Sequence, residues 1–308
     1  MHRTRLTTSQ SAIDAIGRRR QYQHGVHSLT STSLSNIIAT DSADIYTFNF
    51  MLSSRILLII LTYNYVYNKK SFTIICLTAL WLPLGALIFC YVTASLFQAD
   101  DIHETHCRVY NVVPSISAIT GISPQRYVWR ICIAYHLGPR LLIGSLYFNY
   151  HKERTLHITD EQMRLTATKL GKACYWLNLV ELFALTGVTY VSNRENYFIH
   201  EKIFIIFMVA SLLHMLCRAR IGCIANDVLE PVRTNKIVWN LFFIAIAATT
   251  GLIIFFLRHR LLCRPLAFTW FSVCEYILAT TNMVFHAIVV LDLPFHEVKV
   301  VYSERKSN

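Results

Sequence analysis

Four ionisable side chains that can exchange protons lie inside long apolar stretches of this sequence. His136 lies in the second such stretch, Glu181 lies in the third, and Glu275 and His286 lie in the sixth. A histidine oriented by a carboxylate can take the proton of a lipid hydroxyl and so activate it for acyl transfer. The sequence lacks the short motifs of serine hydrolases, HxxxxD acyltransferases and HExxH metalloenzymes. Catalysis by these four residues is therefore a hypothesis based on residue type and position.

Cationic side chains gather on one face of the second apolar stretch. At about 100° per helical residue, Arg126, Trp129, Arg130, His136 and Arg140 fall within an arc of roughly 120°. Arginine presents a planar fork of donors that suits phosphate oxygens. The stripe predicts a site for a phosphate-bearing lipid, with the three arginines as its ligands. The indole of Trp129 could cover the rim of that site or an acyl chain.

The sixth stretch repeats this pattern, because Glu275, Asn282 and His286 fall within about 40° of one another on a helix. An ionised side chain in hydrocarbon costs at least about 2.5–3.5 kcal/mol, so each should face the interior and have a partner. A second interpretation is therefore structural: the arginines would pair with Glu181 or Glu275, and the histidines would form hydrogen bonds between helices. The residues alone leave both interpretations open.

The composition predicts a membrane protein. The chain has 308 residues, of which 54% are hydrophobic and 15% are charged, and its mean hydropathy is +0.40. Soluble domains carry about 25% charged residues, so the polar share is too small to cover a surface that faces water. The net charge of +11 fits lysine and arginine that collect in cytoplasmic loops. No nucleic-acid-binding signature occurs, and we expect no nucleic-acid partner.

The hydropathy pattern predicts an all-α membrane bundle of six transmembrane helices within residues 69–292. Lysine and arginine are richer in alternate loops, which predicts that both termini are cytosolic. Residues 1–46 are expected to form a disordered, basic, Ser/Thr-rich tail, and residues 293–308 a cytosolic tail. The short apolar segment 47–68 could be a surface helix or an extra span. The predicted spans are Phe72–Phe97, Tyr127–Tyr150, Ala173–Val191, Lys202–Cys217, Ile237–Leu257 and Ala267–Leu291.

Two of the nine cysteines lie in polar loops that this orientation places in the lumen. Cys107 and Cys263 are predicted to form a disulfide there, since that compartment is oxidising. The other cysteines lie mostly inside apolar runs, where a thiol acts as a small hydrophobic group. Histidines also occur in these loops, but without the short spacings of metal ligands, so no metal site is predicted.

Several strings resemble the post-GPI-attachment-to-proteins factor 2 family. The two most specific are PQRYVWR, from Pro124 to Arg130, and TNMVFH, from Thr281 to His286. Shorter matches include Leu177–Glu181 and Ile199–Glu201. The resemblance runs from about Lys69 to Asp292, and residues 1–68 have no counterpart in it. The cationic stripe, from Arg126 to Arg140, falls on the strongest string of this resemblance.

The resemblance implies a role in the lipid remodelling of glycosylphosphatidylinositol (GPI) anchors in the Golgi membrane, and possibly also in the endoplasmic reticulum. A separate phospholipase first removes an unsaturated chain from the anchor, and the family is then needed for restoring a saturated chain at the same glycerol position. A related module begins the fungal proteins that place ceramide on the anchor. The implied partners are GPI-anchored proteins with their lyso-GPI lipid, membrane lipids and other remodelling enzymes. No cofactor is implied.

The resemblance leaves the mechanism open between two classes. The chain could be a GPI-lipid acyltransferase, or it could be a non-enzymatic escort that binds lyso-GPI and presents it to another enzyme. A third class, an ion or proton carrier, would explain the buried Arg, His and Glu residues, but the sequence lacks the broken-helix, inverted-repeat pattern of many transporters.

Overall fold

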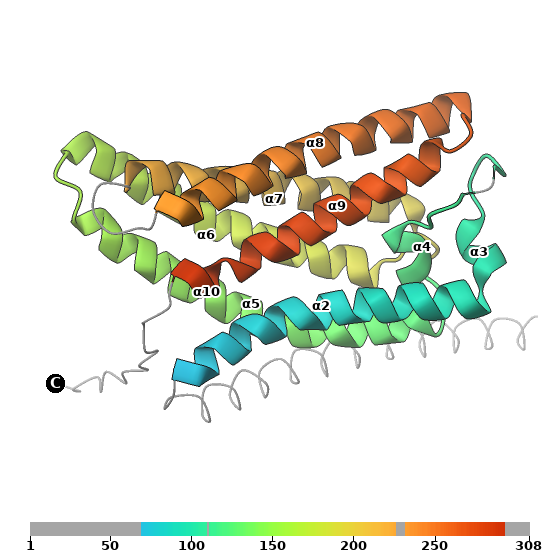
Figure 1. Ribbon diagram of the computed structural model, residues 1–308, viewed down its shortest axis with the longest axis horizontal. Helices are drawn as coiled ribbons and strands as arrows, with labels where there is room; N and C mark the ends of the chain where they lie inside the picture. The colour runs from blue at the N-terminus through green and yellow to red at the C-terminus, as the bar shows by residue number, and fades with distance from the viewer. Residues whose placement is uncertain (1–68, 110, 226–231, 293–308) are drawn as a thin grey trace, which may run out of the picture. The chain divides into compact units, whose positions relative to one another are not determined.

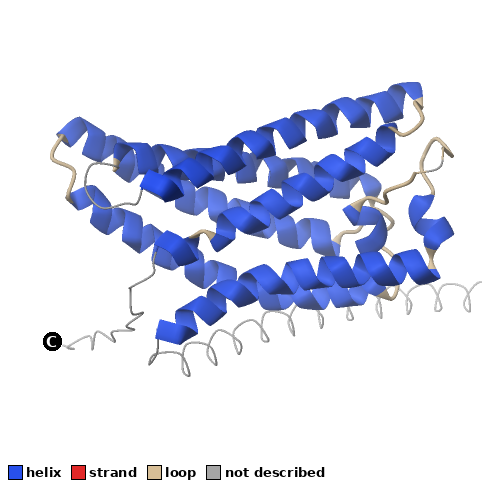
Figure 2. Ribbon diagram, in the orientation of Figure 1, coloured by secondary structure: helices blue, strands red, loops and turns tan. Residues whose placement is uncertain are grey.

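The computed structural model describes residues 69–109, 111–225 and 232–292, and within these ranges it contains helices and loops but no strand (Figure 2). The predicted all-α class is therefore confirmed. The chain divides into two units, Met1–Arg55 and Ile56–Asn308, and every described residue belongs to the second unit. The predicted tails 1–46 and 293–308 and the apolar segment 47–68 lie outside the described residues.

Six long helices form most of the described structure, and three short ones complete it (Figure 1). Each long helix packs against the next one in the chain, and the last, α9, packs back against the first, α2. The long helices therefore form a closed ring of contacts around a common interior. The long helices are α2 (Lys69–Phe97), α5 (Gln125–Leu156), α6 (Glu161–Tyr190), α7 (Tyr197–Ile224), α8 (Val232–Leu262) and α9 (Ala267–Ala287). The short helices are α3 (Ala99–His103), α4 (Ile116–Thr120) and α10 (Val289–Asp292).

The helices extend beyond the apolar spans that hydropathy predicts. The fourth span was expected at Lys202–Cys217, whereas α7 is 28 residues long and runs from Tyr197 to Ile224. Side-chain caps set two of these starts: Asp160 accepts hydrogen bonds from the first turn of α6, and Asn196 accepts one from Ile199 N–H at 3.1 Å. Hydropathy detects only the apolar part of a helix, while the backbone ladder continues through polar residues.

The sixth predicted span is shorter than expected and is divided. Helix α9 ends at Ala287, and α10 follows as a separate turn from Val289. Arg218 of α7 holds α10 in place, since its Nη2 donates to Oδ2 of Asp292 at 2.6 Å and its Nε donates to the hydroxyl of Tyr147 at 2.9 Å. The side chains of Arg218 and Asp292 are both buried, and their ion pair therefore lies in the interior of the bundle.

Four of the described helices are long and apolar enough to cross a membrane, judged by length and composition. Helices α6 and α9 do not meet that criterion. Both carry several polar residues that face the interior, among them Glu181 in α6 and Glu275 in α9. Such residues lower the mean hydropathy of a helix without exposing charge to lipid. The four spans are Ile74–Phe97, Gln125–Leu156, Tyr197–Ile224 and Thr234–Leu262.

The bundle places apolar side chains outside and charged ones inside, the reverse of a soluble domain. Trp81 and Phe183 are 59% and 71% exposed, while Glu181 and Arg218 are each 1% exposed. Soluble proteins almost never bury unpaired charges and rarely expose contiguous large apolar surfaces. A lipid environment accounts for both features. The structure is that of a multi-pass membrane protein.

A disulfide joins two loops at the end of the bundle where α3 and α4 lie, which we call the α3–α4 end. Cys107 lies between α3 and α4, and Cys263 lies between α8 and α9. Their sulfur atoms are 2.14 Å apart, and the remaining seven cysteines are free. These are the two residues that the loop positions in the sequence predicted to pair.

We expect Cys107 and Cys263 of the mature protein to resist a thiol-alkylating mass tag until a reductant is added. The exposed free thiol of Cys223 should react without reductant and serves as the internal control. A Cys107→Ala variant should make Cys263 reactive at once, which peptide mass spectrometry would show. Alkylation of both residues in unreduced, mature protein would contradict the disulfide.

Candidate functional site

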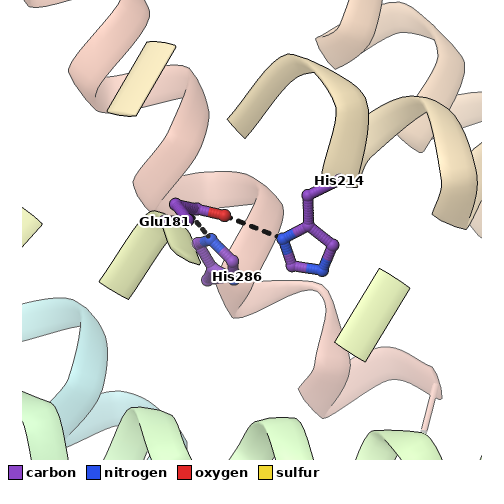
Figure 3. A group of neighbouring side chains, drawn as sticks. All are labelled: Glu181, His214 and His286. Carbon is purple, nitrogen blue, oxygen red and sulfur yellow. Dashed lines mark hydrogen bonds and ion pairs between the residues drawn. The ribbon is translucent and has the colours of Figure 1, made fainter. Parts of the chain in front are cut away.

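A buried carboxylate in the middle of α6 is the centre of the polar interior. Oε2 of Glu181 accepts a hydrogen bond from Nδ1 of His214 at 2.8 Å, and Oε1 accepts one from Nε2 of His286 at 2.8 Å (Figure 3). Oε1 also accepts from the Asn282 amide at 2.8 Å and from Nη2 of Arg140 at 3.4 Å. We call these five residues the Glu181 cluster. The carboxylate thus has four donors from three other helices.

The neighbours of the Glu181 cluster extend its hydrogen-bond network. The Asn282 amide also donates to Oγ of Ser211 on α7 at 2.6 Å, and Arg140 donates to Oδ1 of Asn178 at 3.4 Å. Gly144 leaves room for the Asn178 side chain, because a Cβ at this position would collide with the Asn178 amide. The network therefore fixes the relative positions of α5, α6, α7 and α9.

Three members of the Glu181 cluster could also hold a metal ion. One ligand atom each of Glu181, His214 and His286 lies within 4.8 Å of the others. However, Oε1 of Glu181 already accepts hydrogen bonds from Asn282 and Arg140. A guanidinium 3.4 Å from the same oxygen would repel a cation. The arrangement therefore fits a hydrogen-bonded ion pair better than a metal centre.

A largely apolar cavity lies inside the ring, next to the Glu181 cluster. His136, Arg140 and His286 line its inner part, and Ser117, His200 and Glu275 line the part that lies near α4. We call it the apolar cavity, because apolar side chains form most of its wall. These include Leu80, Leu87, Ile133, Phe204, Phe207 and Leu278.

A second cavity lies toward α10 and shares two residues with the first. Arg140 and His286 line both cavities, and Tyr147, His151 and Arg218 line only the second. The Glu181 cluster therefore stands between two hollow regions of the bundle.

Three of the four predicted catalytic residues, His136, Glu275 and His286, line this cavity, and Glu181 does not. Glu181 and His286 are in contact, and His136 lines the same cavity with its Nδ1 lacking a hydrogen-bond partner among the described residues. Glu275 instead accepts a hydrogen bond from the backbone N–H of Ile116 at 2.8 Å. Of the two carboxylates that the structural interpretation named as arginine partners, Glu181 is the one that pairs with Arg140.

The cationic stripe on α5 also divides into two parts. Arg140 pairs with Glu181, as one interpretation of the sequence expected, whereas Arg126 and Arg130 pair with Glu195 at 3.4 and 2.7 Å. Arg130 also donates to the carbonyl of Tyr190 at 2.8 Å, near the end of α6. The three arginines thus do not meet at one point. Their predicted role as phosphate ligands stays a prediction.

Trp129, which was expected near a cavity rim, is buried and packs in a core cluster with residues such as Cys90 and Ile133. It also lines the apolar cavity. Its position in the wall fits contact with an acyl chain better than cover for a surface site.

Two residues that matter to this geometry were not assigned to the site from the sequence. Glu195 lies in the short loop between α6 and α7, where acidic residues are common. Partial burial alone would raise its pKa, but hydrogen bonds from Ser192 and Arg130 hold that pKa below its ordinary value, so it stays ionised. His214 lies in an apolar helix, and nothing in its local sequence indicates its contact with Glu181.

The fold and the site together define a class of protein: an all-helical, multi-pass membrane protein with a buried charge cluster beside an apolar internal cavity. The chain belongs to the family described as the Frag1/DRAM/Sfk1/Cwh43P N-terminal domain, whose model matches residues 71–295. No solved structure matches the chain.

Named relatives cover most of the chain. It is 46% identical to "Post-GPI attachment to proteins factor 2-like" of Drosophila melanogaster over 79% of this chain and 75% of that protein. It is 33% identical to "Acyltransferase PGAP2" of Xenopus tropicalis over 74% of this chain and 90% of that protein. It is 32% identical to "Post-GPI attachment to proteins factor 2" of Caenorhabditis elegans over 71% and 84%.

Replacement of Glu181 by alanine is expected to destabilise the purified protein by about 3–5 kcal/mol, because it leaves Arg140 buried without its carboxylate. Glu161→Ala on the same helix is the matched control, since its pair with Arg164 is exposed and worth at most about 1 kcal/mol. The thermal unfolding midpoint, measured on monodisperse protein in detergent, gives the change in stability of each variant. Equal midpoints for wild type and Glu181→Ala would contradict a stabilising role for the cluster.

Proposed function

We propose that this chain acts in the lipid remodelling of GPI anchors after their attachment to protein, where it restores a saturated acyl chain to the lyso-GPI lipid. The observation that carries the proposal is a largely apolar cavity within the bundle that has proton-exchanging side chains among its lining residues. The names of relatives that cover over 70% of the chain support it. A single chain anchors a protein only marginally, so the second chain gives stable surface display.

The reaction class we propose is acyl transfer to a lipid hydroxyl. The acyl chain would lie along the apolar wall of the cavity, with Trp129 in contact with it. Of the sequence-predicted groups, His136 would accept a proton, and Glu181 would orient His286 through Nε2. Glu275 would hold α4 against the cavity by its bond to Ile116.

The anchor phosphate would bind outside the cavity, at the α3–α4 end. Arg126 and Arg130 are partly exposed there, with 23% and 20% of their side chains accessible. Glu195 holds both guanidinium groups in place, and a phosphate would add oxygens on their accessible side. Arg140 is buried with Glu181, so we assign it to the interior and not to the phosphate site.

We further propose six membrane spans, with both termini in the cytosol, in the Golgi membrane. Helices α6 and α9 are as much part of the ring as the four apolar helices, and α9 packs on both α8 and α2. The loops that precede α5, α7 and α9 lie at the α3–α4 end, which would face the lumen together with the disulfide. GPI-anchored proteins, their lyso-GPI lipid and other remodelling enzymes would be the partners.

A non-enzymatic lipid escort is the second candidate. The observation in its favour is that the acidic centre, Glu181, has all its hydrogen-bonding needs met by protein donors. A cavity of this kind could hold lyso-GPI and present it to another enzyme without chemistry of its own.

Expression of the chain in cells that lack their own family member should restore the surface level of a GPI-anchored reporter, measured by flow cytometry. An empty vector and a reporter with a transmembrane anchor are the controls. Correct placement of the chain in the Golgi with no change in the reporter would contradict the proposed function.

His136→Gln separates an acid–base role from an escort role. Glutamine keeps a polar side chain in the cavity wall but cannot accept and release a proton near neutral pH. If His136 acts as a base, the variant should fold normally and lose acyl transfer, followed with a labelled acyl donor and a lysolipid in proteoliposomes. Full activity of the variant would remove His136 from the chemistry.

A further inference from the structure

A serine and a histidine that the sequence did not connect lie in hydrogen-bond contact at the α4 side of the apolar cavity. Oγ of Ser117, in α4, is 2.9 Å from Nε2 of His200, in the first turn of α7. The other ring nitrogen of His200, Nδ1, is 2.7 Å from the carbonyl oxygen of Val191. Both side chains line the cavity, and His200 is buried.

The carbonyl of Val191 determines the tautomer of His200. A carbonyl oxygen only accepts hydrogen bonds, so Nδ1 must carry a proton and donate it. In a neutral ring, Nε2 then has the lone pair and accepts the hydrogen bond from the Ser117 hydroxyl. A hydroxyl, a histidine that accepts its proton, and a third group that orients the ring are the parts of an activated nucleophile.

Hydrogen bonds at the two preceding residues hold the turn that carries Ser117 in place. The Ser115 hydroxyl caps α4 by accepting from Ala118 N–H at 3.2 Å, and Glu275 accepts from the backbone N–H of Ile116, directly before Ser117. Helix α9 contacts this turn through Glu275, and helix α7 contacts it through His200. The site lies in the first turns of α4 and α7, whereas His136 lies further along α5.

We propose that Ser117 is a nucleophile with His200 as its general base, and that acyl transfer passes through an acyl-serine. This inference rests on the proposed function, adds a covalent intermediate to it, and assigns the proton transfers to His200 in place of His136. The donor is a fatty acyl ester or thioester, and the acceptor is the free hydroxyl of a lysolipid. The acyl chain occupies the apolar wall of the cavity during both steps.

The two steps balance. In the first, Ser117 Oγ attacks the donor carbonyl and its proton passes to His200 Nε2; the bond to the alcohol or thiol leaving group breaks, and that group takes the proton. In the second, the lysolipid hydroxyl gives its proton to His200 and attacks the acyl-serine; the Oγ–carbonyl bond breaks and Oγ recovers the proton. The net result is transfer of one acyl group from donor to lysolipid.

The test is covalent labelling of the full-length protein in membranes with a long-chain alkyl fluorophosphonate that carries an alkyne. We expect wild type to be labelled at Ser117, as located by peptide mass spectrometry. Ser117→Ala should abolish the label, and His200→Gln should reduce it at least tenfold. Ser145→Ala, which removes an exposed hydroxyl of α5, is the matched control and should be labelled like wild type.

Undiminished labelling of a folded Ser117→Ala variant, or no labelling of wild type, would overturn the proposal. If Ser117→Ala does not fold, His200→Gln and Ser117→Cys are used instead, and labelling of His200→Gln equal to wild type would also overturn it. A failure of the proposed function would give a different result from a failure of the acyl-serine proposal. Full remodelling of anchors by a Ser117→Ala variant would remove the acyl-serine and leave the function, whereas absence of remodelling by wild type would remove the function itself.

Discussion

The structure depends on one carboxylate that has no access to water. Glu181 lies in the middle of a bundle whose exterior is apolar, where an unpaired charge would cost several kcal/mol. It is retained because Arg140 neutralises it and because His214, His286 and Asn282 donate to its two oxygens. These donors come from α5, α7 and α9, so a single ionised group specifies how four of the six long helices meet. Gly144 of α5 leaves room for the Asn178 amide beside this cluster.

The internal cavity follows from this arrangement. Helices held together at a polar centre by side chains leave apolar space toward α4, and Arg140 and His286 separate that space from the second cavity toward α10. The polar groups of the cavity are thus of two kinds. Those in the Glu181 cluster are engaged with one another and stabilise the bundle, while Ser117 and His200 form a separate contact of 2.9 Å on the α4 side. A lipid that enters with its chain along the apolar wall would bring its glycerol to Ser117 and His200.

Part of this could be predicted from the sequence because it is local. Hydropathy located all six long helices, and the helical period placed Glu275, Asn282 and His286 on one face of α9, which the structure buries or half-buries together. Helix ends were less well predicted, since caps such as Asn196 lie in polar segments that hydropathy ignores. The family strings PQRYVWR and TNMVFH lie in α5 and α9, on both sides of the cavity.

Helical periodicity did not predict the contacts between most distant residues, although the loop positions of Cys107 and Cys263 did predict their disulfide. The pairing of Ser117 with His200 joins positions 83 residues apart, and the pairing of Arg130 with Glu195 joins positions 65 apart. Each depends on which helices are neighbours, and no periodicity within one helix contains that information. Arg126, Arg130 and Arg140 share a face of α5, yet the chain that covers that face supplies Glu195 at one end and Glu181 at the other, so one predicted site became two.

The most direct measurement is mass spectrometry of GPI-anchor lipids, released from surface and secreted proteins of cells that lack their own family member, with and without this chain. The account predicts that the chain converts anchors with one acyl chain, shed into the medium, into surface anchors that carry two chains with a saturated one restored. Anchor lipids that stay unchanged while the protein is folded and correctly located would contradict the central claim that this cavity serves acyl transfer to GPI.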